Sequence, residues 1–504
     1  MAEEIRVRIA PSPTGKFHIG TARTALFNYL FAKKHGGQFI VRIEDTDRER
    51  NDDVYVKDII DGLLWLGLGF DEGPPFHGVR ATPSKVEEPE VGGQFGPYFQ
   101  SERLDLYKPY VEQLLKEHLA YRCYCTAEEL TKVREADQKK GLAPKYSGRC
   151  RDLTASEIDK FEREGRASVI RFRTEPRKVK FTDLIRDEVE FDAELFGDFV
   201  IVRSDGVPLF NLSNVIDDSL MKISHVLRGE EHLANAAKQI MLAEALRIAV
   251  PEFGHLPLIF NPDRTKMSKR RDPVSVSDDF RARGYLPEAM VNFMALLGWS
   301  GENDREIYTL SELVEEFELE RVGKSPSIFD IEKLKWMNGY YIRNASIGEV
   351  ASEAQNFITD KKLLQATLDK PDFYLETVVL VRDRLKTYAE IEEAIELFYT
   401  APKYDAELLV AKKSTAKNAQ LALVVAAQTL KQIETFSLDE LEPSLRGAAA
   451  SNQLTDGELL WAVRAALSGK AASPGCFELL GILNKDESLK RIATAIKKLK
   501  ALKS

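Results

Sequence analysis

A histidine and a run of basic residues are the first side chains in this sequence whose types and spacing could do chemistry. His18 and Gly20 lie in the segment HIGT, which follows a turn rich in Pro, Gly and Ser. Glycine lets the backbone approach a ligand because it has no Cβ atom, and a helix that begins here would present free N–H groups to an anion. His18 could donate a hydrogen bond to the same phosphate. The alternative is a plain helix start with a surface histidine.

The second group lies in the segment TKMSKRRD, where Lys266, Lys269, Arg270 and Arg271 crowd together. A mobile basic loop can close over phosphates and stabilise the negative charge that develops in a transition state. The alternative is a basic surface loop that holds no ligand.

A parallel α/β framework is expected to position these residues. Residues 5–10 alternate apolar and charged side chains, which indicates a strand, and residues 21–34 carry apolar side chains at helical spacing. Residues 38–43 form a second predicted strand, which ends in the acidic cluster EDTDRER. Strand, turn, helix and strand open a parallel sheet. HIGT then lies at the carboxyl end of the first strand, the edge where such sheets bind ligands.

The pattern changes several times along the rest of the chain. Residues from about 100 to 190 mix charged helices with short β-like pieces, which indicates an insertion between strands of the sheet, and from about 345 the pattern is almost wholly helical. The other predicted elements are a helix at 61–68, a long loop at 74–97, a hairpin at 198–218 with its turn at Asp205-Gly206, and a strand that ends at Arg228.

Composition bounds the class of protein. A chain of 504 residues exceeds one ordinary core, and 44% apolar and 30% charged residues are typical of a globular protein. No apolar run could span a bilayer, and the N-terminus has neither signal-peptide nor transit-peptide character, so we expect a cytoplasmic protein with no membrane partner. The net charge of −9 argues against a uniformly basic nucleic-acid coat. The lysine-rich C-terminus is a local basic patch; taken alone, it is better explained as a solvated helix face.

Taken together, HIGT and TKMSKR resemble the HIGH and KMSKS signatures of class I aminoacyl-tRNA synthetases. The finer match is to the glutamyl-tRNA synthetase family, whose segments recur here in the family's order: RIAPSPTGKFHIGT, FIVRIEDTDRER, DEGP, GPYFQSERLDLY, VIDD, HVLRGEEHL, TKMSKR, GYLPEAMVNFMALLGW and WMNGYYIR. This resemblance covers nearly the whole chain. It implies an α/β fold with a Rossmann-type catalytic domain (1–98 and 209–232), an inserted α/β acceptor-end-binding domain (99–208), a stem-contact domain carrying the KMSKS-like loop (233–345) and an all-helical anticodon-binding region (346–504).

The resemblance also implies a reaction and a site. The protein would activate L-glutamate with ATP and Mg²⁺ and transfer it to tRNA(Glu). Because the attacking carboxylate is already an anion, positioning and charge neutralisation should supply most of the rate without a general base. By resemblance, the ATP site holds His18, Gly20, Thr21, Glu231, Ile259 and Lys269, and the catalytic set is His18, Gly20, Lys266 and Lys269. The glutamate site holds Arg8, Ala10, Ser12, Glu44, Phe210, Asn214 and Arg228.

Two arginines are expected to bind the side-chain carboxylate of glutamate, because a guanidinium fork matches a carboxylate better than lysine does. They are Arg8 and Arg228, while Glu44 would meet the amino group. Arg8 and Glu44 could instead form ion pairs at the edge of the sheet. Phe210 stands where the family commonly has tyrosine. One hydrogen bond to the substrate must then be absent or replaced, an effect of about 0.5–1.5 kcal/mol.

Three of the four cysteines lie close together in the sequence. So few cysteines argue against a disulfide framework. By resemblance, Cys123, Cys125 and Cys150 match a zinc site of some family members, with Asp152 or Tyr146 as the fourth ligand of a closed structural site. The alternative is three reduced thiols without a metal.

Arg384 is the last residue that the resemblance singles out. It matches an arginine that separates tRNA(Glu) from tRNA(Gln) by the last anticodon base, so we expect a discriminating enzyme; the alternative is a helix-surface arginine. The expected partners are tRNA(Glu), L-glutamate and ATP, and the expected state is a monomer. Competing hypotheses are a glutaminyl-tRNA synthetase, whose C-terminal region is typically a β-barrel, a shorter relative that glutamylates a modified tRNA base, a non-catalytic RNA-binding paralogue, and a small-molecule nucleotidyltransferase.

Overall fold

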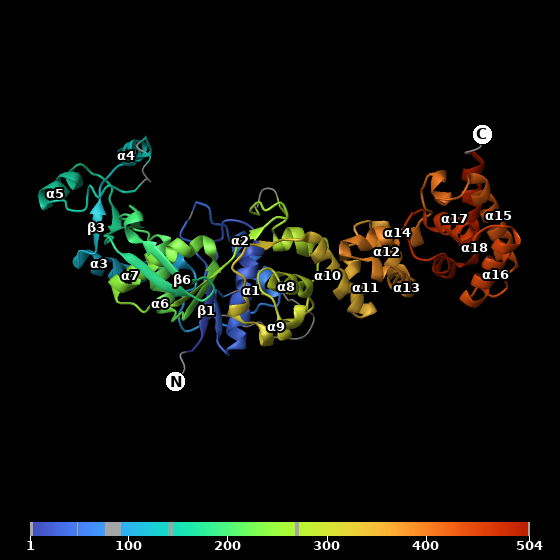
Figure 1. The fold of residues 1–504 in the computed structure, drawn as a ribbon, viewed down its shortest axis with the longest axis horizontal. Helices are drawn as coiled ribbons and strands as arrows, with labels where there is room; N and C mark the ends of the chain where they lie inside the picture. Colours follow the sequence, from blue (N-terminus) through green and yellow to red (C-terminus); the bar gives the residue numbers. More distant parts are fainter. Residues whose placement is uncertain are drawn as a thin grey trace. The chain divides into compact units, whose positions relative to one another are not determined.

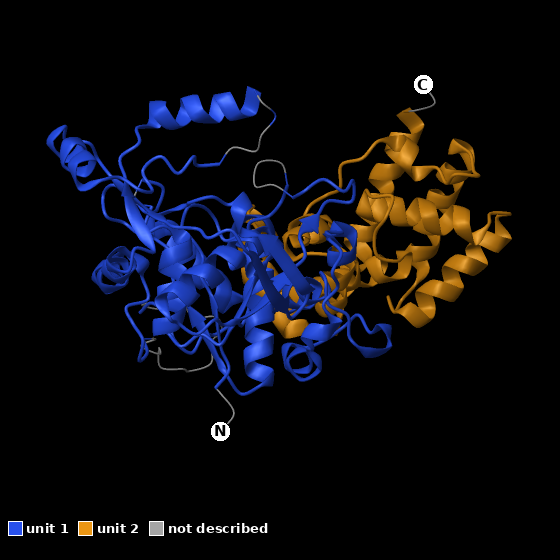
Figure 2. Ribbon diagram, turned by 60° about the vertical axis from the view of Figure 1, so that its left-hand side comes forward, with its two compact units in different colours: residues 1–281, 287–334 blue, residues 282–286, 335–504 orange. Residues whose placement is uncertain are grey.

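A computed structural model describes residues 4–47, 49–75, 92–139, 141, 145–267 and 272–501. The chain divides into two compact units, which Figure 2 colours separately: residues 1–281 with 287–334, and residues 282–286 with 335–504. Most of the predicted long loop lies outside the described residues, and so do Lys269, Arg270 and Arg271. The finer division of the first unit into catalytic, inserted and stem-contact domains stays a prediction.

The first unit opens with the predicted strand, helix and strand. Strand β1 (Arg6–Ile9) pairs in parallel with β2 (Gln38–Val41), with Val7 opposite Phe39. Helix α1 (Ile19–Lys34) connects the two strands and packs against both. The β1–α1–β2 unit is therefore a parallel crossover of the predicted kind, drawn in blue in Figure 1.

A four-stranded sheet continues beside β1. Its strands, in spatial order, are β6 (Asp187–Asp192), β5 (Lys178–Asp183), β9 (Glu252–Leu256) and β8 (His225–Gly229). β8 and β9 are parallel and are joined by helix α7 (Leu233–Leu246). The amide of Ser224, just before β8, donates to the carbonyl of Arg6 at 2.9 Å, so β1 lies next to β8. The carboxyl ends of β1, β8 and β9 thus come together at one edge of the sheet.

A second, antiparallel sheet is formed by strands that lie between β2 and β8 in the chain. Its strands are β3 (Ala120–Cys123), β4 (Val169–Phe172) and β7 (Val200–Val202), in that spatial order. The helices and turns around it are η1 (Gln100–Glu102), α3 (Leu104–Lys116), α4 (Ala127–Lys139), α5 (Ala155–Arg163) and η2 (Ala193–Leu195).

The helix predicted at 61–68 is misplaced. Helix α2 runs from Asp53 to Trp65, because the side chain of Asp52 accepts a hydrogen bond from the Val54 amide (2.9 Å) and starts the helix early. It ends before Gly67, whose positive φ of 74° breaks the helix.

The hairpin predicted at 198–218 is wrong in its second half. The turn at Asp205-Gly206 exists, and the amide of Leu209 still pairs with the carbonyl of Ile201 (2.8 Å). Residues Phe210–Leu220 then form helix α6, not a strand. Residues 212–218 of this helix are all buried, so α6 is enclosed by the fold and does not show the one-sided burial of a surface helix.

The remaining elements of the first unit are short. They are η3 (Glu230–His232), β10 (Ile259–Phe260), the π-helix η4 (Val276–Phe280), η5 (Arg281–Arg283), α8 (Pro287–Ala295), η6 (Glu302–Asp304), α9 (Leu310–Glu316), η7 (Leu319–Arg321) and β11 (Ser327–Ile328), followed by α10 (Ile331–Asn344), which runs from the first unit into the second.

The second unit is built of helices, with no strand among its described residues, as the sequence predicts. Its elements are α11 (Ile347–Gln355), α12 (Lys361–Asp369), α13 (Pro371–Val381), η8 (Arg382–Arg384), η9 (Tyr388–Glu390), α14 (Ile391–Tyr399), η10 (Ala406–Leu409), α15 (Ala416–Gln432), α16 (Leu438–Ser451), α17 (Asp456–Ser468) and α18 (Cys476–Ala501). They share one apolar core, which includes Cys476. The predicted α/β fold class with a helical C-terminal part is confirmed.

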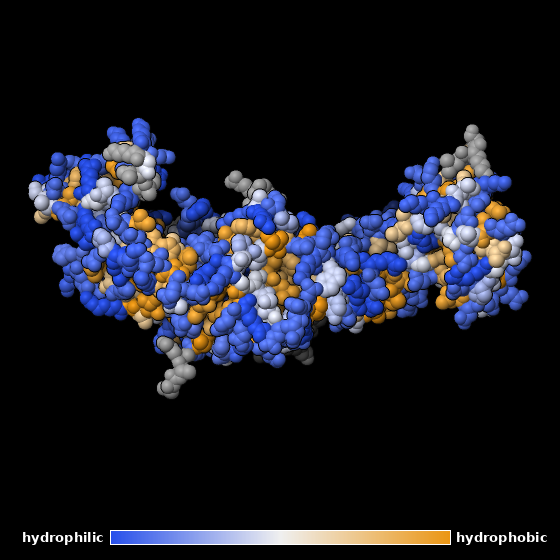
Figure 3. Space-filling model, in the orientation of Figure 1, coloured by the Kyte–Doolittle hydropathy of each residue, from blue (hydrophilic) through white to orange (hydrophobic). Residues whose placement is uncertain are grey.

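The apolar side chains of the described helices do not form a membrane-spanning element. Within the ranges that the structure describes, no helix is both long and apolar enough to cross a bilayer. On the face drawn in Figure 3, hydrophilic residues predominate and hydrophobic residues lie in scattered groups.

Candidate active site

A cavity of about 550 Å³ lies in the first unit, where the carboxyl ends of β1 and β8 meet the N-terminus of α1. Segments that are far apart in the sequence line it together. Every residue that the sequence predicted for the catalytic, ATP and glutamate sites, within the described ranges, lines this one cavity: Arg8, Ala10, Ser12, His18, Gly20, Thr21, Glu44, Phe210, Asn214, Arg228, Glu231, Ile259 and Lys266. The position at the carboxyl edge of a parallel sheet is the one where α/β folds bind ligands.

The start of α1 lines part of the cavity. The Nδ1 atom of His18 accepts a hydrogen bond from the amide of Gly20 at 2.9 Å. A neutral imidazole that accepts at Nδ1 carries its proton on Nε2, so this ring can act as a donor to an anion. The helix start adds the positive end of its dipole, because no acidic side chain occupies its first turn.

The basic segment is anchored beside this end on both of its sides. Lys266 lines the cavity and forms an antiparallel bridge with Phe260. After the segment, the amide of Ile19 donates to the carbonyl of Val274 at 2.8 Å, which ties the returning chain to the start of α1. The described residues on both sides of Lys269 therefore belong to the surroundings of the cavity.

The wall that carries Arg8 is a closed ionic network. Arg8 donates from Nε and Nη2 to the two carboxylate oxygens of Asp218, each at 3.1 Å. Arg42 also reaches Asp218, at 2.6 Å, and donates to the amide oxygen of Asn214 at 2.9 Å. Asn214 in turn donates from Nδ2 to Glu44 at 2.8 Å. The sequence analysis left open that Arg8 forms an ion pair. Arg8 does form one, with Asp218 on α6.

Burial and charge act against each other on the two acids of this network. Burial pushes the pKa of Asp218 upwards, but the guanidiniums of Arg8 and Arg42 lower it to about 2. Burial raises the pKa of Glu44, and the neighbouring Arg42 and the Asn214 amide only partly oppose this. Asp218 is therefore the firmly ionised partner, while Glu44 would gain from a cationic ligand.

The wall that carries Arg228 has neutral partners instead. Arg228 donates from Nε to Nε2 of His255 at 3.2 Å, and from Nη2 to the side-chain oxygen of Gln239 at 2.8 Å. Its Nη1 is buried and has no hydrogen-bond partner among the described residues. Burial and then the positive charge of Arg8 lower the pKa of Arg228 to about 9, which leaves the group charged at neutral pH. Neither of these two side-chain partners of Arg228 carries a negative charge.

Among the lining residues that were not predicted from the sequence, two carry titratable side chains. Arg23 on α1 donates to the carbonyls of Leu297 (3.0 Å) and Pro257, and its Nε has no partner in the described structure. An arginine inside the apolar stretch TARTALFNYLF was the signal that could have found it. The ring of His232 lies 5.3 Å from that of Phe210, and burial lowers the pKa of His232 to about 4, so the imidazole is neutral.

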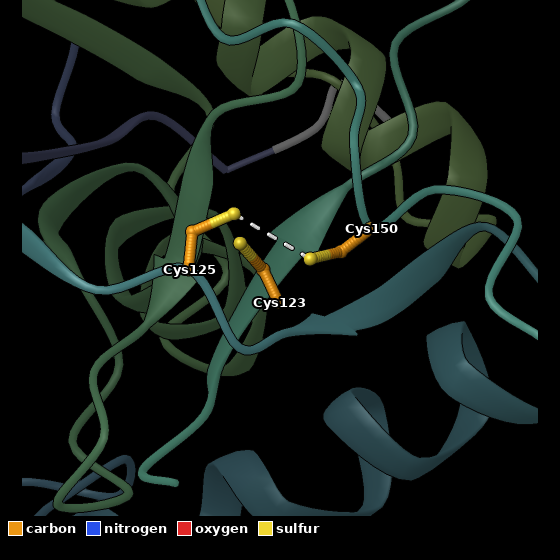
Figure 4. A group of neighbouring side chains, drawn as sticks. All are labelled: Cys123, Cys125 and Cys150. Carbon is orange, nitrogen blue, oxygen red and sulfur yellow. Dashed lines mark hydrogen bonds between the residues drawn. The ribbon is translucent and has the colours of Figure 1, made fainter. Parts of the chain in front are cut away.

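The three predicted cysteines form a second cluster, in the inserted region. Figure 4 shows the side chains of Cys123, Cys125 and Cys150 turned towards one another, and their sulfur atoms lie within 4.8 Å. The hydroxyl of Tyr146 lies 3.3 Å from the sulfur of Cys123. Asp152 is not part of the group, because its exposed carboxylate pairs with Arg173 at 3.0 Å. Of the two proposed fourth ligands, the fold brings only Tyr146 to the thiols.

The predicted anticodon contact and the basic C-terminal patch lie in the second unit. Arg384 ends η8 with an exposed side chain, whose Nη1 donates to the carbonyl of Leu380 at 3.2 Å. In the lysine-rich C-terminal patch, Arg491 is an exception, because it is buried and donates to the carbonyls of Leu397 and Leu467. That arginine supports the core of the unit and offers no charge to a ligand.

Known proteins match the chain along nearly all of its length. A family described as tRNA synthetases class I (E and Q), catalytic domain, matches residues 4–336, and one described as anticodon binding domain matches residues 349–496. A glutamate--tRNA ligase of Moorella thermoacetica is 43% identical over 98% of this chain and 98% of its own, and one of Carboxydothermus hydrogenoformans is 43% identical over 97% and 99%. The crystal structure of a glutamate tRNA ligase from Elizabethkingia meningosepticum, in complex with its amino acid, superposes with a TM-score of 0.84 at 33% identity, covering 99% of this chain and 100% of that one.

Proposed function

Since this chain belongs to the glutamyl-tRNA synthetase family of class I aminoacyl-tRNA synthetases, we propose that it attaches L-glutamate to tRNA(Glu) with ATP. The reaction proceeds through glutamyl-adenylate and releases AMP and diphosphate. The observation that carries the proposal is that thirteen residues predicted from the sequence, among them Arg8 and Arg228, line one cavity together with the start of α1.

ATP binds at the helix-start end in this proposal. The Nε2 proton of His18 and the backbone at Gly20 and Thr21 meet the phosphates, with Lys266 and Lys269 supplying positive charge. Glu231 and Ile259 lie beside the nucleotide. Mg²⁺ accompanies ATP as part of the substrate. The glutamate carboxylate attacks the α-phosphate without a base, so these groups act by positioning and by neutralising charge.

Glutamate binds at the other end. Its side-chain carboxylate is a partner for the free Nη1 of Arg228, with Arg8 as a second cation, and its amino group lies by Glu44. Asn214, Ser12 and Ala10 complete the wall. Phe210 offers no hydroxyl, and the neutral imidazole of His232 packs against its ring.

The inserted region and the helical unit contact tRNA. The inserted sheet holds the acceptor end, and Arg384, exposed on η8, reads the last anticodon base and excludes tRNA(Gln). A region of this kind has no role in a small-molecule nucleotidyltransferase, and its helices differ from the β-barrel of a glutaminyl-tRNA synthetase. We expect a cytoplasmic monomer.

A structural zinc ion fits the cysteine cluster. Three sulfur atoms within 4.8 Å of one another and a tyrosine hydroxyl beside them form a four-ligand set of closed type. The Arg171 guanidinium lies 3.8 Å from the centre of the Tyr146 ring. Metal analysis of protein purified without chelator should find about one equivalent of zinc, and less than about a tenth would exclude the site. Cys125→Ser should lose the zinc, while Cys476→Ser, in the second unit, should keep it.

The test of the proposed function is charging of tRNA(Glu) and tRNA(Gln) transcripts, side by side, with labelled glutamate and ATP. Charging of tRNA(Glu) alone is expected. Charging of both tRNAs would support the proposed ligase activity but contradict the role of Arg384 as a discriminator. No charging of either would contradict the proposal and support a non-catalytic RNA-binding protein.

A further inference from the structure

A buried chain of three side chains stands behind the glutamate end of the cavity. Asp183, the last residue of β5, lies 2.5 Å from Nδ1 of His255 on β9, and Nε2 of His255 accepts from Arg228 on β8. Asp183 and His255 are 2% and 0% exposed, and they contact each other directly. Neither residue lines the cavity, and neither has a part in the proposed reaction.

The proton positions in this chain follow from its partners. Arginine has only donors, so the Nε2 atom that faces Arg228 must be an acceptor, and the proton of a neutral His255 lies on Nδ1, towards Asp183. Burial lowers the pKa of His255 in spite of its acidic partner, which keeps the ring neutral. Burial would raise the pKa of Asp183, but the hydrogen bonds from His255 and from the backbone amides of Arg186 and Ile185 lower it. A carboxylate therefore fixes the tautomer.

The fixed tautomer restricts Arg228. Its Nε is held by His255 and its Nη2 by Gln239, so two of its three nitrogens have protein partners that accept but carry no negative charge. The third, Nη1, has none in the described structure. This arrangement orients the guanidinium without neutralising it, which leaves its charge for a ligand.

We propose that Asp183 and His255 are positioning residues that set the selectivity for glutamate over glutamine by holding Arg228 in this orientation. The inference rests on the proposed function, because it assumes that Arg228 receives the substrate's side-chain carboxylate. A carboxylate can accept from Nη1 and satisfy the buried charge. The amide of glutamine is neutral and carries donors, so it is a poorer acceptor for Nη1 and does not compensate the buried charge.

The replacement Asp183→Asn tests the tautomer. The asparagine oxygen can still accept from the backbone amides that Asp183 Oδ1 serves. Its NH₂ group, however, would face Nδ1 of His255 as a donor, so the ring would have to carry its proton on Nε2, where it would meet the Nε–H of Arg228. Two donors facing each other should displace Arg228.

The expected result is an increase of roughly 10- to 100-fold in the KM for glutamate, a KM for ATP within about twofold of the wild type, and a smaller preference for glutamate over glutamine in kcat/KM. His255→Gln is the conservative rescue, because a glutamine amide can donate to Asp183 and accept from Arg228; its KM for glutamate should stay within about threefold of the wild type. Asp187→Asn is the matched control, the same change at an exposed carboxylate four residues along the same β5–β6 hairpin.

A double-mutant cycle with Arg228→Ala separates positioning from a general structural role. If Asp183 acts through Arg228, then Asp183→Asn should change the KM for glutamate by less than about twofold in the Arg228→Ala background. An equal effect in both backgrounds, or a KM for ATP that rises in parallel, would overturn the inference while leaving the proposed function intact. Failure of the wild-type protein to charge tRNA with glutamate would instead refute the proposed function, and this inference with it.

Discussion

The two walls of the cavity hold their arginines in different ways. On the α6 wall, Arg8 forms a bidentate pair with the carboxylate of Asp218. On the β8 wall, Arg228 has only neutral acceptors and a buried nitrogen without a partner in the described ranges. A buried charge that is already paired contributes to the fold, whereas one that is oriented but not neutralised is available to an anionic ligand. Two arginines of one cavity can therefore differ in role: Arg8 stabilises the fold, and Arg228 is available to bind an anionic ligand.

The largest expected effect is on substrate binding at the β8 wall. Arg228→Ala should raise the KM for glutamate at least about 100-fold, because it removes the partner of a buried carboxylate, and should change the KM for ATP little. Steady-state charging kinetics measure both. Equal increases in the two KM values would place glutamate elsewhere in the cavity and remove the distinction between the walls.

The second expected effect is on stability. Replacing Arg8 should destabilise the protein more than replacing Arg228 does, although Arg228 matters more for binding glutamate. Arg8→Met should lower the free energy of unfolding by about 3 kcal/mol, because it takes away one of the two arginines that pair with Asp218 in the core. Arg228→Met should lie within about 1 kcal/mol of the wild type, since it removes a buried charge that has no anionic partner of its own. Urea unfolding of the full-length variants compares them, and a larger loss for Arg228→Met would contradict the contrast.

The pH dependence of stability sharpens the description of the Arg8 wall. The pKa of Asp218 is about 2 in the folded protein, below the ordinary value of 3.8. A depressed pKa gives stability that is present above pH 4 and lost as the pH falls towards 2, about 2 kcal/mol in all. Glu44 acts in the opposite sense, because its pKa is raised. The stability difference between the wild type and Asp218→Asn isolates Asp218 and should shrink over this range; a constant difference would argue against the pair.

The smallest expected effect concerns the residue that begins α6. Phe210→Tyr adds a hydroxyl to a ring that lines the cavity and should lower the KM for glutamate by up to about tenfold, the value of one neutral hydrogen bond. An unchanged or higher KM would mean that His232 already fills this role or that the hydroxyl has no room.

The sequence predicted the contents of the cavity better than its internal bonding. The positions of His18, Gly20, Arg8 and Arg228 followed from strand ends and helix starts, because local patterns fix where such elements begin. The pairing of Arg8 with Asp218 could not be foreseen, since it joins β1 to a segment that was predicted to be a strand and is α6. The two-residue period of a strand and the roughly four-residue period of a helix are hard to distinguish over so short a stretch.

Contacts between distant segments were equally hidden. Asp183 and His255 lie 72 positions apart and belong to no recognisable motif, so only the pairing of β5 with β9 brings them together. The choice between Asp152 and Tyr146 beside the cysteines depended on where Arg173 lies. Arg491 looked like part of a basic surface patch, but the fold turns it inward to three backbone carbonyls. In each case the deciding partner comes from another element.

The contrast between the walls is tested most directly by a crystal structure of the protein with L-glutamate. The account predicts a side-chain carboxylate oxygen within about 3 Å of Nη1 of Arg228, the amino group beside Glu44, and an Arg8–Asp218 pair that keeps both of its hydrogen bonds. Glutamate bound with its side chain towards His18, or an Nη1 that remains without a partner while Arg8 leaves Asp218 to bind the ligand, would contradict it.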